Sequence, residues 1–278
     1  MKSVLGPKVV IGIEVGIVAA LTGAGLFAPQ GLKVWYAALI QGFAMVTLPV
    51  LAAGGAVTWY SERRTVRIQG PRKGSMLAYR GLRDTALAGW IAATLLAWPL
   101  ARIRAGEPTG LTWDLEQAGG PLAVFLQTAG GILVLDAWLY WKHRLLHTRL
   151  LFPFHRKHHG YRDPTALAGF AVGPLESLLT FWPVLFLAMP EAPHYGPVYF
   201  TLVVGFIAFN LYLHCGVVWH GLEAILRPLS FNTSSHHNRH HANAETHYAE
   251  ALTIWDRLLG TWEGAKHKTR REQTVDSV

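Results

Sequence analysis

Histidine is concentrated in three short segments of this chain. The sequence contains 14 histidines and a single cysteine. Most of the histidines lie in the segments His143–His147, His155–His159 and His236–His241. Neutral imidazole is a common ligand for iron, zinc, copper and nickel. The sequence therefore predicts a metal site built from several separate segments.

The spacing within each segment predicts which rings point the same way. His143 and His147 are four residues apart, and HxxHH spacing occurs twice, at 155–159 and 237–241. Residues three and four apart share one face of a helix. With His214, which follows an apolar stretch, the segments supply more nitrogen donors than one metal ion binds. The pattern favours two metal ions with positions left for dioxygen or water. The predicted ligands are His143, His147, His155, His158, His159, His214, His237, His240 and His241.

Other interpretations of the histidines remain open. His236 is an alternative to His237, although only His237 completes the HxxHH spacing, and His247 is left unassigned. His194, His220 and His267 are interpreted as ordinary hydrogen-bonding residues. A structural pair of zinc ions is the alternative to a reactive centre. A histidine-rich pH sensor would not need such regular spacing.

Long apolar stretches predict a membrane protein. Hydrophobic residues make up 51% of the chain and charged residues 15%. A helix needs about 20 apolar residues to cross a bilayer. The fold class predicted is an all-α, multi-span membrane bundle with a histidine-rich cap that binds two metals. The fifth stretch contains Gly173, Pro174 and Glu176, and is therefore expected to be broken, tilted or re-entrant. The stretches are 9–28, 34–60, 85–101, 121–142, 165–189 and 196–213.

Basic loops predict the orientation of these spans. The loop after the second stretch is rich in arginine, and such loops stay in the cytoplasm. Counting crossings from there places both termini and all three histidine segments on the cytoplasmic side, with a bacterial inner membrane as the expected location. The net charge of +8 is thus assigned to loops and not to nucleic-acid binding. The basic residues are Arg63, Arg64, Arg67, Arg72, Lys73, Arg80 and Arg83, with Lys266, Lys268, Arg270 and Arg271 in the tail.

The sequence around the histidines resembles that of the fatty acid hydroxylase superfamily, and in particular its sterol desaturase branch of integral-membrane diiron enzymes. The resemblance covers roughly residues 120–265, while residues 1–119 add N-terminal membrane helices to what is expected to be a single domain over 1–278. The matching segments are Asp136-Ala-Trp-Leu-Tyr-Trp-Lys-His143-Arg-Leu-Leu-His147, Phe154-His155-Arg-Lys-His158-His159, Asn210-Leu-Tyr-Leu-His214-Cys-Gly216, Asn232-Thr-Ser-Ser-His236-His237-Asn-Arg-His240-His241 and Trp255-Asp256-Arg-Leu-Leu-Gly260-Thr261.

The resemblance implies an oxygen-dependent enzyme. The predicted histidines would bind two iron ions, for which zinc can substitute in a purified sample. The implied reaction is hydroxylation of an unactivated C–H bond of a sterol, fatty acyl, carotenoid or ether lipid; desaturation at the same site is the alternative. Because the chain has no nucleotide-binding motif or cysteine set, a separate ferredoxin or small haem protein with its reductase would supply electrons. A membrane metal-binding or transport protein is the alternative from another class, although transporters place their ligands near the midplane.

Several residues near the histidines are candidates to orient or replace a ligand. Relatives resembling fatty acid 2-hydroxylases have histidine where this chain has Asn210, and many sterol desaturase relatives have histidine where it has Gly173. Asp136 lies two helical turns before His143, so it would either accept a hydrogen bond from a ligand or make a packing contact. Glu14 lies far from every motif and receives no role. The candidates are Asp136, Glu176, Asn210, Asn232, His236 and Asp256.

Overall fold

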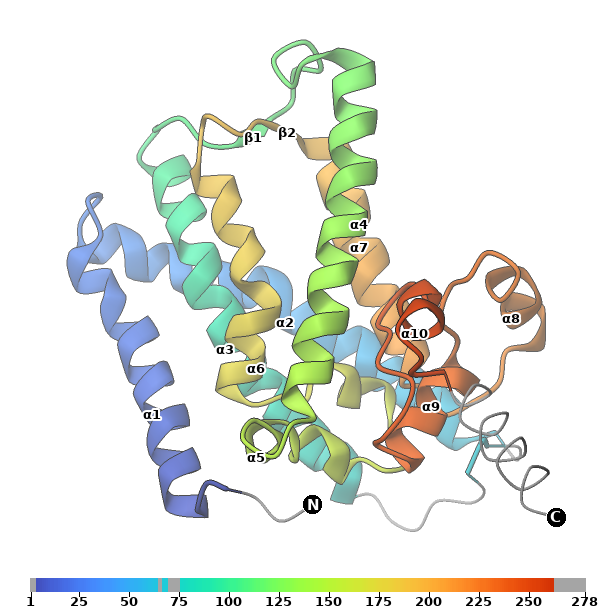
Figure 1. Cartoon of the computed structure of the whole chain (residues 1–278). Helices are drawn as coiled ribbons and strands as arrows, with labels where there is room; N and C mark the ends of the chain where they lie inside the picture. The colour runs from blue at the N-terminus through green and yellow to red at the C-terminus, as the bar shows by residue number, and fades with distance from the viewer. Residues whose placement is uncertain (1–3, 65–66, 70–75, 263–278) are drawn as a thin grey trace, which may run out of the picture.

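The computed structural model describes residues 4–64, 67–69 and 76–262, and these residues are mostly helical, with only two short strands (Figure 1). Within these described residues, five helices are long and apolar enough to cross a membrane. The protein is therefore a multi-pass membrane protein of all-α class, as its sequence predicts. The helices are α1 (Pro7–Gly23, extended by η1, Ala24–Phe27), α2 (Leu32–Glu62), α3 (Met76–Arg104), α4 (Gly120–Leu146) and α7 (Gly196–Leu213). Arg72, Lys73, Lys266, His267, Lys268, Arg270 and Arg271 lie outside the described residues.

The fifth apolar stretch is broken, as Gly173 and Pro174 predict. It contains a 3₁₀ turn, η3 (Ala166–Phe170), then α6 (Pro174–Phe181) and a second 3₁₀ segment, η4 (Trp182–Ala188). Pro174 begins α6, where its missing N–H costs no helical hydrogen bond. Because a 3₁₀-helix rises about 2 Å per residue, α6 and η4 together extend about 26 Å. This segment carries the chain back toward the end where β1 and β2 lie (Figure 1).

Two short strands join the loops at that end. β1 (Leu111–Thr112) pairs in parallel with β2 (His194–Tyr195), and His194 N donates to Gly110 O over 2.6 Å. The remaining short helices are α5 (Phe152–His155), η2 (His158–Gly160), α8 (His220–Leu226), α9 (Ser234–Ala242) and α10 (Ile254–Leu258). The start of α1, together with α5 and α9, lies toward the opposite end, and α8 and α10 lie at the side of the bundle near α9 (Figure 1). All three histidine segments therefore share one end of the bundle.

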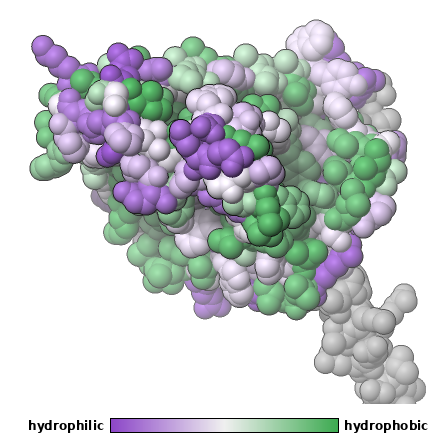
Figure 2. Space-filling view, turned by 90° about the horizontal axis from the view of Figure 1, so that it is seen from above, coloured by the Kyte–Doolittle hydropathy of each residue, from purple (hydrophilic) through white to green (hydrophobic). Residues whose placement is uncertain are grey.

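Small residues bring α2 and α3 close together. A Cβ at Gly89 would collide with the side chain of Thr47, so the two backbones approach where glycine allows it. Trp35 and Leu39 of α2 are fully buried where this helix packs against α3. On the outer surface, by contrast, large apolar side chains such as Val134 are exposed, as expected for contact with lipid. Figure 2 shows hydrophobic residues around much of the periphery and hydrophilic residues gathered in a few patches.

Candidate metal centre

The nine predicted histidines form two compact groups at one end of the bundle. Within each group the candidate ligand atoms all lie within 4.8 Å of one another, and either group could hold a metal ion. We call them the five-histidine group and the four-histidine group. The first contains His143, His147, His155, His159 and His240, and the second contains His158, His214, His237 and His241.

The two HxxHH segments each contribute to both groups. His155 and His159 belong to the five-histidine group, whereas His158 between them belongs to the other. In α9, His237 and His241 join the four-histidine group and His240 the first. In each HxxHH segment, the first and last histidines thus share one group, and the histidine between them belongs to the other group. This division is consistent with the roughly 100° rotation between successive helical residues.

The local fold differs from the expected continuous helix at residues 155–159. α5 ends at His155, and His158 begins the 3₁₀ turn η2, so the rings converge across two short elements. In contrast, α9 is a regular helix whose first turn is capped by Thr233, which accepts a hydrogen bond from His236 N. His147 and His214 each occupy the position that ends a long helix. The two groups therefore lie where α4 and α7 end.

The two groups are neighbours. The ring centroids of His155 and His158, which belong to different groups, are 5.1 Å apart. Those of His159 and His241 are 5.3 Å apart. These separations are similar to the spacing within each group, such as 5.0 Å between His143 and His155. The arrangement suits one centre with two adjacent ions.

Hydrogen bonds fix the orientation of several rings. His143 Nδ1 donates to Tyr248 O over 2.9 Å, His214 Nδ1 to Asn210 O over 2.9 Å and His240 Nδ1 to Thr246 O over 2.6 Å. A carbonyl only accepts, so each Nδ1 carries the proton and each Nε2 keeps a lone pair. His155 Nδ1 lies 2.8 Å from Glu176 Oε2, which sets the same tautomer. Ligands of protein-bound metals are held in this way.

The inward-facing nitrogens fit metal ions. Among the described residues, His143 Nε2 and His155 Nε2 are buried and have no hydrogen-bond partner. Such atoms are costly to leave unsatisfied. His237 Nε2 faces His214 Nε2 at 2.9 Å, and His159 Nε2 faces His240 Nε2 at 3.2 Å. Two nitrogens that each bind one ion at about 2.1 Å lie roughly 3 Å apart. A shared ion would satisfy each group.

Burial keeps these histidines uncharged. It lowers the pKa of His147 to about 2, with His240 nearby adding to the effect. Burial likewise lowers the pKa of His214 and of His240 to about 4, although their hydrogen bonds to backbone carbonyls oppose the change. The imidazoles are therefore neutral near pH 7, which leaves their lone pairs available to a metal.

We expect the metal-free protein to lose stability in mild acid. Histidine in the unfolded chain binds protons below about pH 6.5, while the buried rings of His214 and His240 do not until about pH 4. The free energy of unfolding should therefore fall as pH drops between these values, by up to about 1.4 kcal/mol per pH unit for each such histidine. Thermal unfolding of the chelated protein near pH 7.5 and near pH 5 measures this. An unchanged midpoint would contradict the neutral, buried state of the rings.

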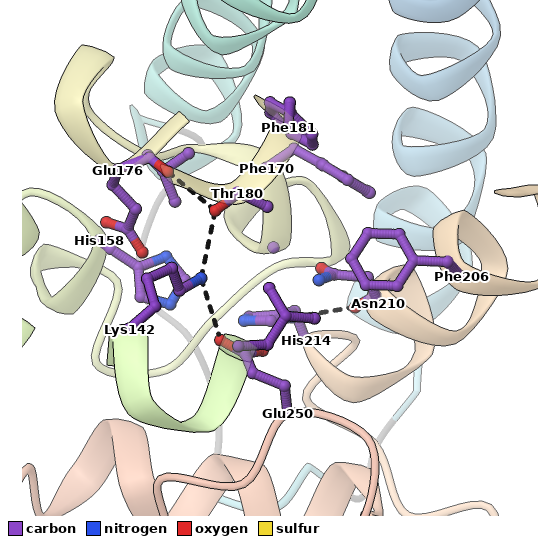
Figure 3. A pocket seen from close by; sticks show the side chains of 13 residues that line it. Lys142, His158, Phe170, Glu176, Thr180, Phe181, Phe206, Asn210, His214 and Glu250 are labelled. Carbon is purple, nitrogen blue, oxygen red and sulfur yellow. Dashed lines mark hydrogen bonds and ion pairs between the residues drawn. The ribbon is translucent and has the colours of Figure 1, made fainter. Parts of the chain in front are cut away.

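A small cavity lies against the four-histidine group (Figure 3). Its volume of about 20 Å³ suits one water molecule. Lys142 is 5% exposed, and its Nζ donates to Thr180 Oγ1 over 3.1 Å and lies 3.5 Å from Glu250 Oε1. The opposite wall is apolar and includes Phe170, Phe181 and Phe206. Sequence reasoning missed Lys142, although a lysine directly before His143 in an apolar helix was a signal.

Of the remaining candidates, Glu176 and Asn210 contact histidines of the two groups, whereas His236 and Asn232 make other contacts. Glu176 contacts His155, a predicted ligand, as the orienting role considered for it requires. Asn210 uses its backbone carbonyl to hold His214, and its side chain packs against Gly169 beside the cavity. His236 lies outside both groups, so the structure places His237 among the other rings. Asn232 donates to Ala249 O over 2.8 Å, so its amide holds the C-terminal segment.

Asp136 makes the packing contact and not the contact with a ligand. Its carboxylate accepts hydrogen bonds from Ala251 N over 3.0 Å and Trp255 Nε1 over 2.8 Å, and from Leu252 N as well. His143, which it was considered to orient, instead donates to Tyr248 O. Asp136 therefore anchors the C-terminal segment to α4.

We expect Asp136→Asn to destabilise the fold while the five-histidine and four-histidine groups still form in the folded protein. One of the two oxygens becomes an NH₂ group that faces N–H donors, which should cost about 1–3 kcal/mol. Thermal unfolding measured in detergent, with metal content determined on the folded fraction, tests this. Glu191→Gln, at an exposed loop position, is the control. Loss of metal without loss of stability would point instead to direct support of a ligand.

Glu14 lies close to the site although it is far away in sequence. It belongs to α1, and its carboxylate occupies the space into which a side chain at residue 173 would extend. A Cβ at Gly173 would also lie 3.1 Å from Phe154 O, one residue before His155. The Glu14 carboxylate thus occupies the space beside Gly173, a position at which the resemblance to the sterol desaturase branch implies a histidine.

The fold and site define a class: a multi-pass membrane protein whose buried histidines, gathered at one end, could hold metal. Residues 128–261 match the family model described as "Fatty acid hydroxylase". The match includes every residue of both histidine groups. The resemblance inferred from the sequence is therefore confirmed.

The chain is also similar to curated lipid-modifying oxidoreductases. It is 31% identical to human lathosterol oxidase over 46% of this chain and 42% of that protein. It is 26% identical to alkylglycerol monooxygenase of Xenopus tropicalis over 83% of this chain and 48% of that protein. It is 28% identical to methylsterol monooxygenase 1 of Rattus norvegicus over 54% of this chain and 51% of that protein. The chain thus spans about half the length of these relatives. No solved structure matches it.

Proposed function

We propose that the protein binds two iron ions in its histidine groups and uses dioxygen to hydroxylate an unactivated C–H bond of a membrane lipid. The observation that carries this proposal is the pair of adjacent, buried histidine groups with their Nδ1 atoms tied to acceptors. Desaturation at the same site is the alternative outcome. Zinc is expected to replace iron in some preparations, since imidazole binds both.

The iron pair, when bound, would activate dioxygen for oxidation of the C–H bond, and the two electrons that reduce dioxygen in each turnover would come from the separate electron carrier. The residues of the chain hold the two ions and exclude water from their surroundings. Lys142 holds a proton at Nζ beside the four-histidine group, with Thr180 and Glu250 as its partners (Figure 3). The phenylalanines on the opposite wall supply an apolar surface for a hydrocarbon.

The substrate proposed is a long apolar lipid that enters from the bilayer. The names of the relatives refer to sterols and alkylglycerols. The apolar wall of Phe170, Phe181 and Phe206 is compatible with these, and equally with fatty acyl or carotenoid chains. The cavity in its present form is too small for such a molecule, so binding requires the wall to open.

We propose that both termini and the histidine end face the cytoplasm of a bacterial inner membrane. The basic residues flanking α2 and α3 support this orientation. A separate ferredoxin or small haem protein with its reductase would then deliver electrons from the cytoplasm. Basic side chains such as Arg64 and Arg80 are exposed at this end and are suited to an acidic carrier.

The function is tested on the purified full chain. The folded protein should hold iron in the two groups and, when chemically reduced, consume oxygen in the presence of lipid. Lipid extracts from cells with and without the gene should differ by the gain of one oxygen atom, or by the loss of two hydrogens for desaturation. Metal transport into proteoliposomes without oxygen uptake would favour a transporter instead. The position of the ligands at the ends of α4 and α7, away from the midplane, disfavours that alternative.

A further inference from the structure

A third cluster of metal-binding side chains lies apart from the two histidine groups. His236, His247 and Asp256 offer ligand atoms within 4.8 Å of one another. His236 Nε2 lies 2.9 Å from His247 Nδ1 and 3.5 Å from Asp256 Oδ2. The nitrogen–nitrogen distance equals the 2.9 Å between His237 and His214 in the four-histidine group. The same close approach of ring nitrogens therefore recurs at a third place.

The three side chains are buried together. His236 is 8% exposed, His247 1% and Asp256 0%. Trp262 covers them, because its ring stacks on His236 with centroids 4.4 Å apart. A buried carboxylate is costly unless a positive charge or hydrogen bonds compensate it. Two imidazoles and one carboxylate form a donor set that suits zinc or ferrous iron.

The backbone of the Thr246–Tyr248 segment connects this cluster to the five-histidine group. Thr246 O accepts from His240 Nδ1, and Tyr248 O accepts from His143 Nδ1. His247, between them, has a left-handed φ of 63°, which is uncommon for a residue other than glycine. Its ring joins His236 and Asp256, while the flanking carbonyls hold two ligand rings. Asp256 also accepts from Tyr248 N over 2.9 Å.

We propose that His236, His247 and Asp256 bind a third divalent transition-metal ion, with a structural role. The ion would add a positive charge to the hydrogen bonds that Asp256 accepts from Tyr248 N, Ala249 N and Thr261 Oγ1. It would also hold His247 in its left-handed conformation. By fixing the Thr246–Tyr248 segment, it would also hold the two carbonyls that orient His240 and His143. This proposal concerns residues outside the nine-histidine centre and stands whether or not that centre oxidises a lipid.

Metal counting on the full chain tests the proposal. The protein is purified in detergent, stripped with a chelator, reloaded with zinc, and its metal content is determined on the monodisperse fraction. We expect His236→Gln and His247→Asn each to hold one zinc ion fewer per chain than the wild type. His220→Asn, at an exposed position on α8, is the matched control and should keep the wild-type number. Equal metal content in wild type and both variants overturns the proposal.

Anomalous scattering at the zinc edge gives an answer that depends on no variant. Crystals of the zinc-loaded wild type should show a peak between His236, His247 and Asp256. Absence of that peak means that the three side chains form a hydrogen-bonded network without metal, and the proposal is wrong. Peaks in the two histidine groups are scored separately, so failure of the nine-histidine centre is distinguishable from failure of the third site.

Discussion

His240→Ala is expected to abolish turnover and to deplete metal from the five-histidine group. His240 is fully buried, its Nε2 faces His159 Nε2 at 3.2 Å, and its Nδ1 is held by Thr246 O. Alanine removes one donor and leaves a cavity that water can enter. Mutation of a residue that only supports a metal ligand typically lowers metal affinity or activity about 10–100-fold. Because His240 is itself a predicted ligand, we expect a loss of at least about 100-fold in activity.

His158→Ala is the matching test of the four-histidine group. His158 belongs to that group and also lines the small cavity, so its loss should deplete the other ion. Both variants should still insert into the membrane, since the apolar helices are unchanged. The measurements are metal content, oxygen uptake with lipid, and the fraction of protein recovered in washed membranes. His220→Ala, outside both groups, controls for general effects of removing a histidine. Full turnover by either variant would contradict the assignment of ligands.

Glu176→Gln is expected to weaken metal binding about 10–100-fold without dismantling the fold. Glu176 Oε2 accepts from His155 Nδ1 at 2.8 Å, and both side chains are almost fully buried. Glutamine preserves the volume but replaces the carboxyl group with an amide, a weaker hydrogen-bond acceptor, which lowers the basicity of His155 toward a metal.

Metal affinity, measured by competition with a coloured chelator, tests this role of Glu176. Unfolding should be followed on the metal-free variant, so that a change in affinity is separated from a change in stability. Glu191→Gln, in the loop at the other end of the bundle, is the same substitution at an exposed position. Unaltered affinity would show that Glu176 contributes only to packing within α6.

The candidate ligands could be predicted from the sequence because histidine spacing is a local property. HxxxH and HxxHH place rings within one or two turns, so His143 and His147, or His237 and His241, were expected together before any tertiary contact was known. Apolar length predicted the spans, and Gly173 with Pro174 predicted the break before α6. The sequence also selected His237 over His236 on spacing alone, which agrees with the placement of His237 among the rings.

What surrounds the ligands was decided by the tertiary structure. Asp136 lies on the face expected for it, but the C-terminal segment packs there and takes its hydrogen bonds. Glu14 comes to lie beside Gly173 only because α1 packs against α6. The division of the rings into groups of five and four joins segments that are far apart along the chain. The approach of His247 to His236 depends on the left-handed backbone conformation of His247. Spacing along a helix fixes which rings point together, whereas their partners depend on how the helices pack.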